Sequence, residues 1–120
     1  MSNEFLDYIE DILDAMGKAE IMLEGVEFKE FMDDFRINFV VVRALEIVGE
    51  ATKRLPMSLR EQYPDIPWKR MAGMRDRIIH GYDIIDYEVV WDAVKQEIPQ
   101  VKPHMQQILA DYSDDDPLNE

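Results

Sequence analysis

The side chains best suited to chemistry lie together in one short segment, Met-Arg-Asp-Arg-Ile-Ile-His-Gly-Tyr. Arg75 could make a bidentate contact with a phosphate and stabilise charge that develops in a transition state. His80 could act as a general acid or base, since an imidazole ring can both accept and donate a proton. Tyr82 offers a hydroxyl, and Asp76 could orient a partner's histidine or pair with Arg77 or Arg75. With no metal-ligand pattern nearby, these residues favour metal-independent cleavage of RNA through the ribose 2′-hydroxyl.

The spacing of Arg75 and His80 limits how they can act together. Five residues along a regular helix correspond to a rotation of about 500°, so the two side chains would point ~140° apart and lie ~7.5 Å apart along the axis. Two arrangements overcome this. The helix could loosen at Gly81 so that His80 turns back, or two protomers could bring their segments together across a two-fold axis.

Other interpretations of the polar residues remain open. His80 and the arginines before it stand in the last turns of an expected helix, where cations are favoured by the helix dipole. Glu46 and Glu50 could form part of a Mg²⁺ site, as in a nucleotide hydrolase of helical-bundle type, if other helices supplied more carboxylates. They could equally form an ion-pair ribbon with Arg43 and Lys53, three or four residues away on the same helix.

Composition restricts the class of protein. The 120 residues suit one domain with a real core, since 47% are hydrophobic. There is no cysteine, no apolar run long enough to span a membrane, and no signal peptide at the start, so we expect a cytoplasmic protein. The net charge of −13 disfavours broad coating of nucleic acid. Residues 53–77 nevertheless hold seven basic and three acidic residues, a net of +4, against −17 for the remainder.

The hydrophobic pattern predicts helices that would hold the polar segment in place. An amphipathic helix is expected over 3–24, with Gly25 as its stop. A second helix over 34–55 is apolar around most of its surface, which indicates a central helix or one that also meets another subunit. Gly49 lies within it, and close approach of a neighbouring backbone would compensate for its low helix propensity.

The second half of the chain predicts two more main helices. One runs from Trp68 into His80 and ends at Gly81. The next begins at Asp86 as N-cap and runs to about Ile98, where Pro99 interrupts it before a last helix. The predicted fold is all-α: an up-and-down four-helix bundle with extra short helices, in one domain over 1–111, followed by an acidic, flexible tail over 112–120. The short helices are expected at 28–32 and 58–62, and the last helix at about 100–111.

The polar segment and its surroundings resemble a known family. Arg75-x₄-His80-x-Tyr82, together with the stretches 44–51, 54–56, 66–74 and 90–91, is similar to the HepT-type toxins of the HEPN superfamily. The resemblance covers residues 3–110 and implies a HEPN-like helical bundle, a homodimer and a ribonuclease toxin. In that family the Arg-x₄-His motifs meet in a cleft at the dimer interface, which would make Arg75 and His80 the catalytic pair, with no metal or cofactor.

The resemblance also implies a partner and a modification. The partner would be a minimal nucleotidyltransferase antitoxin, which can attach AMP to the motif tyrosine, here Tyr82. The RNA substrate would be tRNA or mRNA. This chain has Asp76 where the family often has Asn, and an acid beside Arg75 could weaken phosphate binding or hold the arginine in place. The alternative is a non-catalytic, acidic helical dimer that serves as the binding partner of a nucleotidyltransferase.

Overall fold

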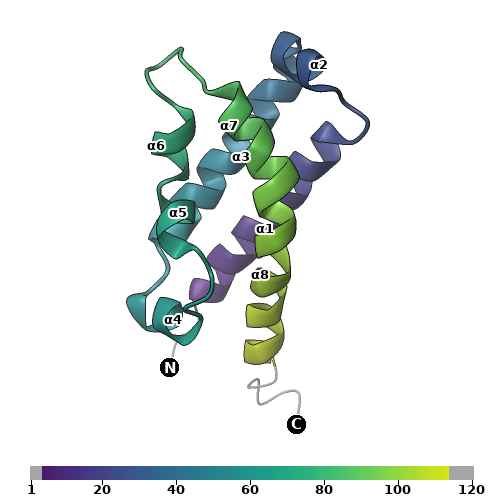
Figure 1. Ribbon diagram of the computed structural model, residues 1–120. Helices are drawn as coiled ribbons and strands as arrows, with labels where there is room; N and C mark the ends of the chain where they lie inside the picture. Colours follow the sequence, from purple (N-terminus) through teal and green to yellow (C-terminus); the bar gives the residue numbers. More distant parts are fainter. Residues whose placement is uncertain (1–3, 114–120) are drawn as a thin grey trace.

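The computed structural model describes residues 4–113 and shows an all-α bundle of four antiparallel rods, as predicted (Figure 1). Two rods are single long helices, the third is a pair of short helices, and the fourth is one long run with a change of helix type in its middle. None of the helices in residues 4–113 is long and apolar enough to cross a membrane. The rods are α1 (Phe5–Leu23), α3 (Phe35–Lys53), α5 (Trp68–Ala72) with α6 (Met74–Ile78), and α7 (Tyr87–Asp92) with the π-helical η1 (Ala93–Glu97) and α8 (Ile98–Ser113).

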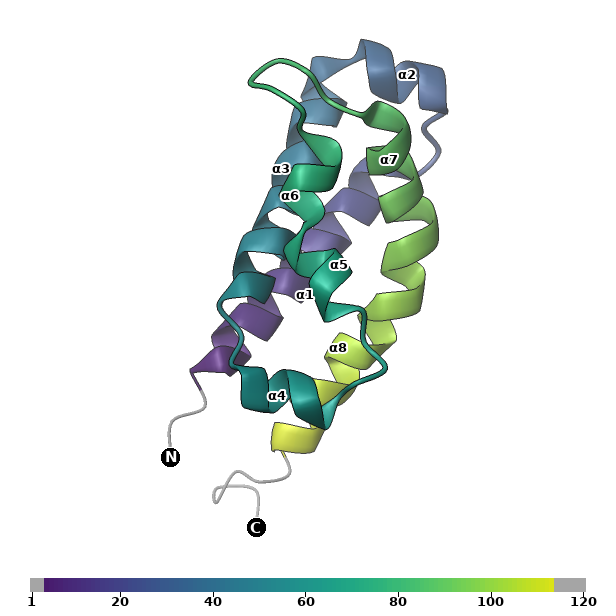
Figure 2. The same cartoon turned by 60° about the vertical axis from the view of Figure 1, so that its left-hand side comes forward.

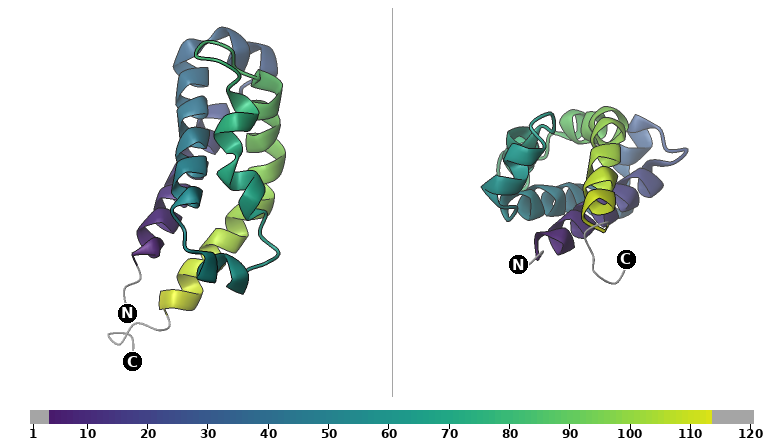
Figure 3. Two further views of the ribbon diagram at one scale, coloured as in Figure 1. Left: turned by 90° about the vertical axis from the view of Figure 1, so that its left-hand side faces the viewer. Right: turned by 90° about the horizontal axis from the view of Figure 1, so that it is seen from below.

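Two short helices cross the ends of the bundle. α2 (Phe28–Asp33) links α1 to α3 at one end, and α4 (Met57–Gln62) links α3 to α5 at the other. The side view in Figure 3 shows the loop between α6 and α7 at the same end as α2. The polar segment singled out in the sequence therefore lies at one end of the bundle.

The core forms where the apolar faces of the rods meet. In α1 the residues with little or no exposure recur at intervals of three and four and face α3 and α8. α1 ends as predicted, because Gly25 adopts a positive φ of 69° just after it. The expected start at residue 3 lies outside the described residues. The buried residues of α1 are Ile9, Ile12, Ala15, Met16, Ala19 and Leu23.

At Gly49, α3 lies very close to the third rod. A Cβ placed on Gly49 would lie 3.2 Å from the Cβ of Met74 and 3.4 Å from the carbonyl oxygen of Met71. The expectation that a neighbouring backbone compensates for this glycine is confirmed. The contact sets the distance between α3 and α6, the short helix that carries Arg75 (Figure 2).

The predicted single helix from Trp68 to His80 is wrong. The rod breaks at Gly73 and α6 ends at Ile78, after which Ile79 is extended with φ −118° and ψ 116°. Ile79 instead pairs with Ile85 in an isolated antiparallel bridge. Gly81 does not adopt the left-handed conformation expected of a helix stop, because pairing across the loop ends the helix before it.

Pro99 does not interrupt the fourth rod, contrary to the prediction. The backbone widens into the π-helical turn η1 immediately before it and continues through α8 to Ser113. A π turn changes the hydrogen-bonding register, which accommodates a proline that has no N–H to donate. The helix thus extends past residue 111, and Tyr112 packs edge-on against Phe5 with ring centroids 5.0 Å apart. Residues 114–120 of the predicted tail lie outside the described residues.

Substituting Gly49 with alanine should reduce stability although alanine is the better helix former. The added methyl group would press on Met74 and the backbone of α5, and overpacking of this kind costs about 1–3 kcal/mol. Gly17, within α1, has no atom within 4 Å of its Cβ position, so Gly17→Ala should stabilise by about 1 kcal/mol. Urea unfolding of both variants measures the contrast, and equal stabilisation by the two would contradict the close contact.

Candidate functional site

A groove of about 700 Å³ lies between α3 and the segment that joins α6 to α7. Arg75 reaches into it from α6, and its Nε lies 3.7 Å from Glu46 Oε2 on α3. Glu46 is also 3.9 Å from Arg43, which lies 3.8 Å from Glu50. The ion-pair ribbon expected on α3 is therefore present for these three residues, and it extends to Arg75. The groove is lined by Asn38, Phe39, Val42, Arg43, Glu46, Arg75, Ile79, Tyr82, Asp83, Ile85 and Tyr87.

The segment between α6 and α7 is a short hairpin held by two backbone hydrogen bonds, which together form the Ile79–Ile85 bridge. The His80 N–H donates to the Ile84 carbonyl at 2.9 Å, and the Asp86 N–H donates to the Ile78 carbonyl at 2.8 Å. Side chains alternate between the two faces of such a ribbon. Ile79 and Ile85 line the groove, so His80 and Asp86 lie on the opposite face.

His80 is half exposed, and in the described part of the chain its charged partner is Asp86. Its Nε2 lies 3.7 Å from Oδ2 of Asp86, while Oδ1 of Asp86 accepts the Val89 N–H at 3.2 Å and caps α7, as predicted. His80 is not among the residues that line the groove with Arg75. One chain therefore carries the two predicted catalytic residues on one segment but does not bring them together in the groove.

The remaining predicted residues occupy three different positions. Tyr82 is at the hairpin tip, 99% exposed, and borders the groove. Asp76 is exposed in the first turn of α6 and forms no ion pair or hydrogen bond within residues 4–113 that would link it to His80 or Arg75. Arg77 follows Arg75 by two residues, about 200° around a helix, and points away from the groove.

Arg77 takes part in an ion-pair cluster with Arg70 and Glu97, here called the Glu97 clamp. Glu97 accepts hydrogen bonds of 2.7 and 3.0 Å from Arg77, and of 2.9 and 3.2 Å from Arg70. Burial alone would raise the pKa of Glu97, but the hydrogen bonds from the two guanidinium groups outweigh it and lower that pKa to about 2. The clamp therefore joins α5 and α6 to η1.

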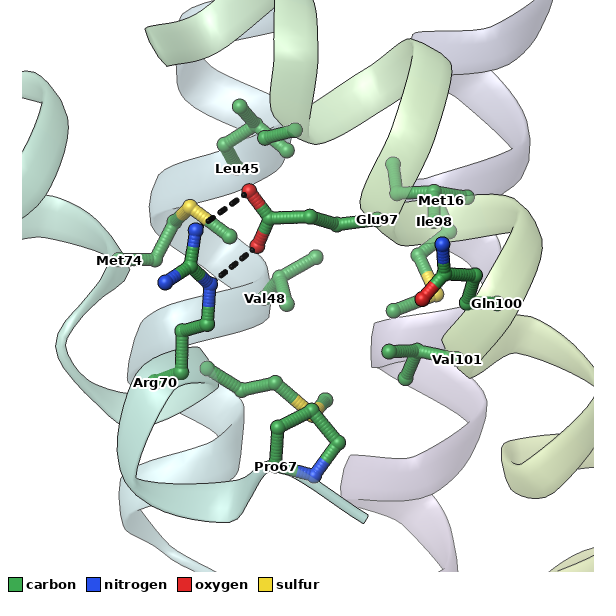
Figure 4. Close-up of a pocket in the computed structure, with 12 residues that line it drawn as sticks. Met16, Leu45, Val48, Pro67, Arg70, Met74, Glu97, Ile98, Gln100 and Val101 are labelled. Carbon is green, nitrogen blue, oxygen red and sulfur yellow. Dashed lines mark hydrogen bonds and ion pairs between the residues drawn. The ribbon is translucent and has the colours of Figure 1, made fainter.

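The Glu97 clamp borders a mainly apolar cavity of about 210 Å³ between the third and fourth rods. Figure 4 shows Glu97 extending from its helix toward Arg70, with Met74 beside the pair. Sequence reasoning missed Glu97, because Arg70 and Arg77 lie 27 and 20 residues away along the chain. An acidic residue in a helix has no local signal that identifies such distant partners.

Several large apolar side chains are exposed on the elements that form the groove. Phe35 and Phe39 of α3 are 66% and 69% exposed and contact each other edge-on, with ring centroids 6.0 Å apart. Ile84, next to the groove residues of the hairpin, is 57% exposed. α3 therefore carries apolar side chains on its exposed side as well as in the core, and the predicted contact of this helix with another subunit stays a prediction.

A family model and the similar proteins of known name all indicate the same family. The model of the family described as "Ribonuclease HepT-like" matches residues 12–108. The chain belongs to the HepT-like ribonuclease family. A protein of Methanocaldococcus jannaschii named "Putative RNase" is 41% identical over 91% of this chain and 90% of its own length. The "Probable ribonuclease HepT" of Thermococcus cleftensis is 42% identical over 85% of this chain and 93% of its own length. No solved structure shows a significant match.

Membership of the HepT-like family agrees with the resemblance found from the motif, and the helical bundle is HEPN-like.

The hypothesis of a Mg²⁺ site at Glu46 and Glu50 is not supported by the arrangement of carboxylates. Within residues 4–113, no three carboxylate or histidine side chains are grouped so that they could hold a metal ion. Glu46 and Glu50 lie instead beside Arg43 and Arg75, so the site lacks the further ligands that this hypothesis requires.

The Glu97 clamp should make stability depend on pH in the acid range. Because the pKa of Glu97 is lowered from 4.5 to about 2 on folding, its contribution is fully present above pH 4.5 and is lost as the pH falls toward 2. A shift of this size corresponds to at most about 3 kcal/mol. Thermal or urea unfolding between pH 6 and pH 2 should show wild type more stable than Glu97→Gln at pH 6, with the difference closing at low pH. A difference independent of pH would contradict this assignment.

Proposed function

We propose that this protein is a metal-independent endoribonuclease and the toxin of a toxin–antitoxin pair. The observation that carries the proposal is the pair Arg75 and His80, present with the family's spacing in a chain that belongs to the HepT-like ribonucleases. Arg75 borders a groove large enough for part of an RNA strand, and His80 is accessible to solvent. Relatives of the chain over most of its length are named ribonucleases, which supports RNA as substrate.

The proposed active form is a homodimer. In a single chain Arg75 lies in the groove and His80 lies on the face of the hairpin away from the groove, so a second copy is needed to complete a site that contains both. Phe35, Phe39 and Ile84 supply exposed apolar surface on the elements around the groove. Burying such side chains is favourable, and two-fold pairing is the commonest way for identical chains to associate.

The chemistry follows from the two side chains. His80 accepts the proton of a ribose 2′-hydroxyl, and the 2′-oxygen attacks the adjacent phosphorus atom. Arg75 stabilises the added negative charge on the phosphate oxygens. The bond from phosphorus to the 5′-oxygen then breaks, and that oxygen takes its proton from His80, which became protonated in the first step. The products are a 2′,3′-cyclic phosphate and a 5′-hydroxyl.

The proposed antitoxin is a nucleotidyltransferase that modifies Tyr82. Its hydroxyl oxygen would form a bond with the α-phosphorus of ATP, with pyrophosphate as leaving group. Two features support this target: Tyr82 is 99% exposed, and it borders the groove that contains Arg75. AMP at this position would add bulk and negative charge, and both oppose entry of an RNA phosphate.

A non-catalytic role as an acidic partner of a nucleotidyltransferase is the second candidate. Two observations favour it. The charged side chains that line the groove balance, two arginines against Glu46 and Asp83, and Asp76 adds another negative charge beside Arg75. The net charge of −13 would also oppose long-range attraction of RNA. Activity measurements separate the two candidates.

Substituting His80 with alanine should reduce RNA cleavage by the purified protein at least about 100-fold, since general acid–base catalysis contributes factors of this order. Cleavage should persist in EDTA. His104, the other histidine, is exposed on α8, so His104→Ala is the matched control and should cleave at the wild-type rate. Unchanged cleavage by His80→Ala, or strict dependence on Mg²⁺, would favour the non-catalytic role or another mechanism.

Mixing two inactive variants tests whether sites are shared between copies. Arg75→Ala and His80→Ala should each be inactive alone. When the two are unfolded together and refolded, mixed dimers carry one chain with an intact Arg75 and one with an intact His80. Activity should return in the mixture if the site combines residues of both copies. A mixture as inactive as its components, despite measured exchange of subunits, would show that each site needs both residues from one chain.

Substituting Tyr82 with phenylalanine should preserve cleavage and prevent neutralisation. The side chain keeps its ring but loses the oxygen that would form the bond to phosphorus. Incubation with a nucleotidyltransferase and ATP should add the mass of AMP to the wild type, with loss of activity, and leave Tyr82→Phe unchanged. Tyr87 also lines the groove but is partly buried, so Tyr87→Phe should still be modified. Modification of Tyr82→Phe would place the target elsewhere.

A further inference from the structure

The geometry points to Asp86 as the residue that positions His80 for proton transfer. This inference rests on the proposed function, because it assigns a role within the same site. Asp86 is the only charged partner of His80 within residues 4–113, with Oδ2 at 3.7 Å from Nε2. Asp76, the residue expected from the sequence to orient a histidine, makes no such contact.

Asp86 is itself held in place at two points. Its backbone N–H donates to the Ile78 carbonyl at 2.8 Å, which fixes it to the end of α6. Its Oδ1 accepts the Val89 N–H at 3.2 Å, which fixes the carboxylate at the N-terminus of α7. The second oxygen, Oδ2, is thereby directed toward the imidazole without competing for the cap. A carboxylate anchored in this way can hold the imidazole ring of His80 in one orientation.

The hairpin brings the two side chains to the same face. With Ile79 opposite Ile85 in the antiparallel bridge, His80 and Asp86 are diagonal neighbours on the face away from the groove. Diagonal neighbours of this kind lie about 7–8 Å apart at the backbone, within reach of long or aromatic side chains. The pairing therefore follows from the register of the bridge, and it fails if the hairpin shifts by one residue.

The chemical consequence concerns both orientation and charge. A carboxylate beside one ring nitrogen holds the imidazole and stabilises the imidazolium that forms when the ring accepts a proton. Here Nε2 faces Asp86, which leaves Nδ1 to accept the 2′-hydroxyl proton. At 3.7 Å the contact is longer than a hydrogen bond. Catalytic contacts of free enzymes are often this long and shorten when substrate binds.

The cap and the positioning role can be separated by substitution. Asparagine is as good an N-cap as aspartate, so Asp86→Asn keeps the contact to Val89 but removes the negative charge beside His80. Glu88, exposed in the first turn of α7, is the matched control, because Glu88→Gln removes a charge from the same turn without facing His80. His80→Ala reports on the proposed function independently.

The test measures kcat and KM for RNA cleavage, with thermal unfolding of each variant. Asp86→Asn should lower kcat at least about 10-fold while KM stays within about twofold, since Asp86 acts on His80 and does not touch the RNA. Its melting temperature should match the wild type, and Glu88→Gln should cleave normally.

Four other outcomes would overturn either the positioning role of Asp86 or the proposed function. Normal cleavage by Asp86→Asn, with cleavage lost in His80→Ala, overturns the positioning role and leaves the proposed function intact. A fall in activity that comes with an equal loss of thermal stability, or with a raised KM and unchanged kcat, also overturns it, because Asp86 would then act through the fold or on binding. Normal cleavage by His80→Ala overturns the proposed function itself.

Discussion

The backbone bridge between Ile79 and Ile85 determines how the polar segment is displayed. Because Ile79 takes part in the bridge, α6 ends at Ile78. The bridge also closes the hairpin that leads to α7. Side chains alternate between the two faces of a β-ribbon, so Ile79 and Ile85 face the groove and His80 lies on the opposite face. The separation of Arg75 from His80 within one chain, which the proposed dimer would overcome, follows from this pairing.

The bridge can act only if α6 is itself fixed, and α6 is too short to be stable alone. It is held from two sides. On one side the absent side chain of Gly49 lets Met74 approach α3 closely. On the other side the Glu97 clamp ties Arg70 and Arg77 to η1. Arg77 thus contributes to the site through the position of α6, since its guanidinium group points away from the groove.

The sequence was sufficient for features that depend on local patterns. The spacing of apolar residues predicted α1 and α3 to within two residues at each end within the described part of the chain, and Gly25 and Asp86 were correctly assigned as a helix stop and a helix cap. These features depend on residues within one or two turns of each other. The groove residue Arg75 was found in the same way, from its side chain and its motif.

Features that depend on distant pairing were not found from the sequence. The early end of α6 results from Ile79 pairing with Ile85. In the sequence, Ile78 and Ile79 followed by His80 and Gly81 are equally typical of the last turn of a helix. The continuation through Pro99 depends on a π turn that no composition rule signals. Glu97 matters only because folding places two arginines around it.

The contact between Arg75 and Glu46 bears on the phosphate-binding role proposed for Arg75. At 3.7 Å, with the Arg75 side chain more than half exposed, the ion pair is worth no more than about 1 kcal/mol. It is sufficient to hold the guanidinium group at the groove but weak enough to exchange for a phosphate, which offers bidentate, charge-assisted hydrogen bonds. Glu46 also lies near Arg43, so Arg75 can leave it without isolating a carboxylate. In the free protein, Glu46 on α3 therefore keeps Arg75, the proposed catalytic arginine, at the groove.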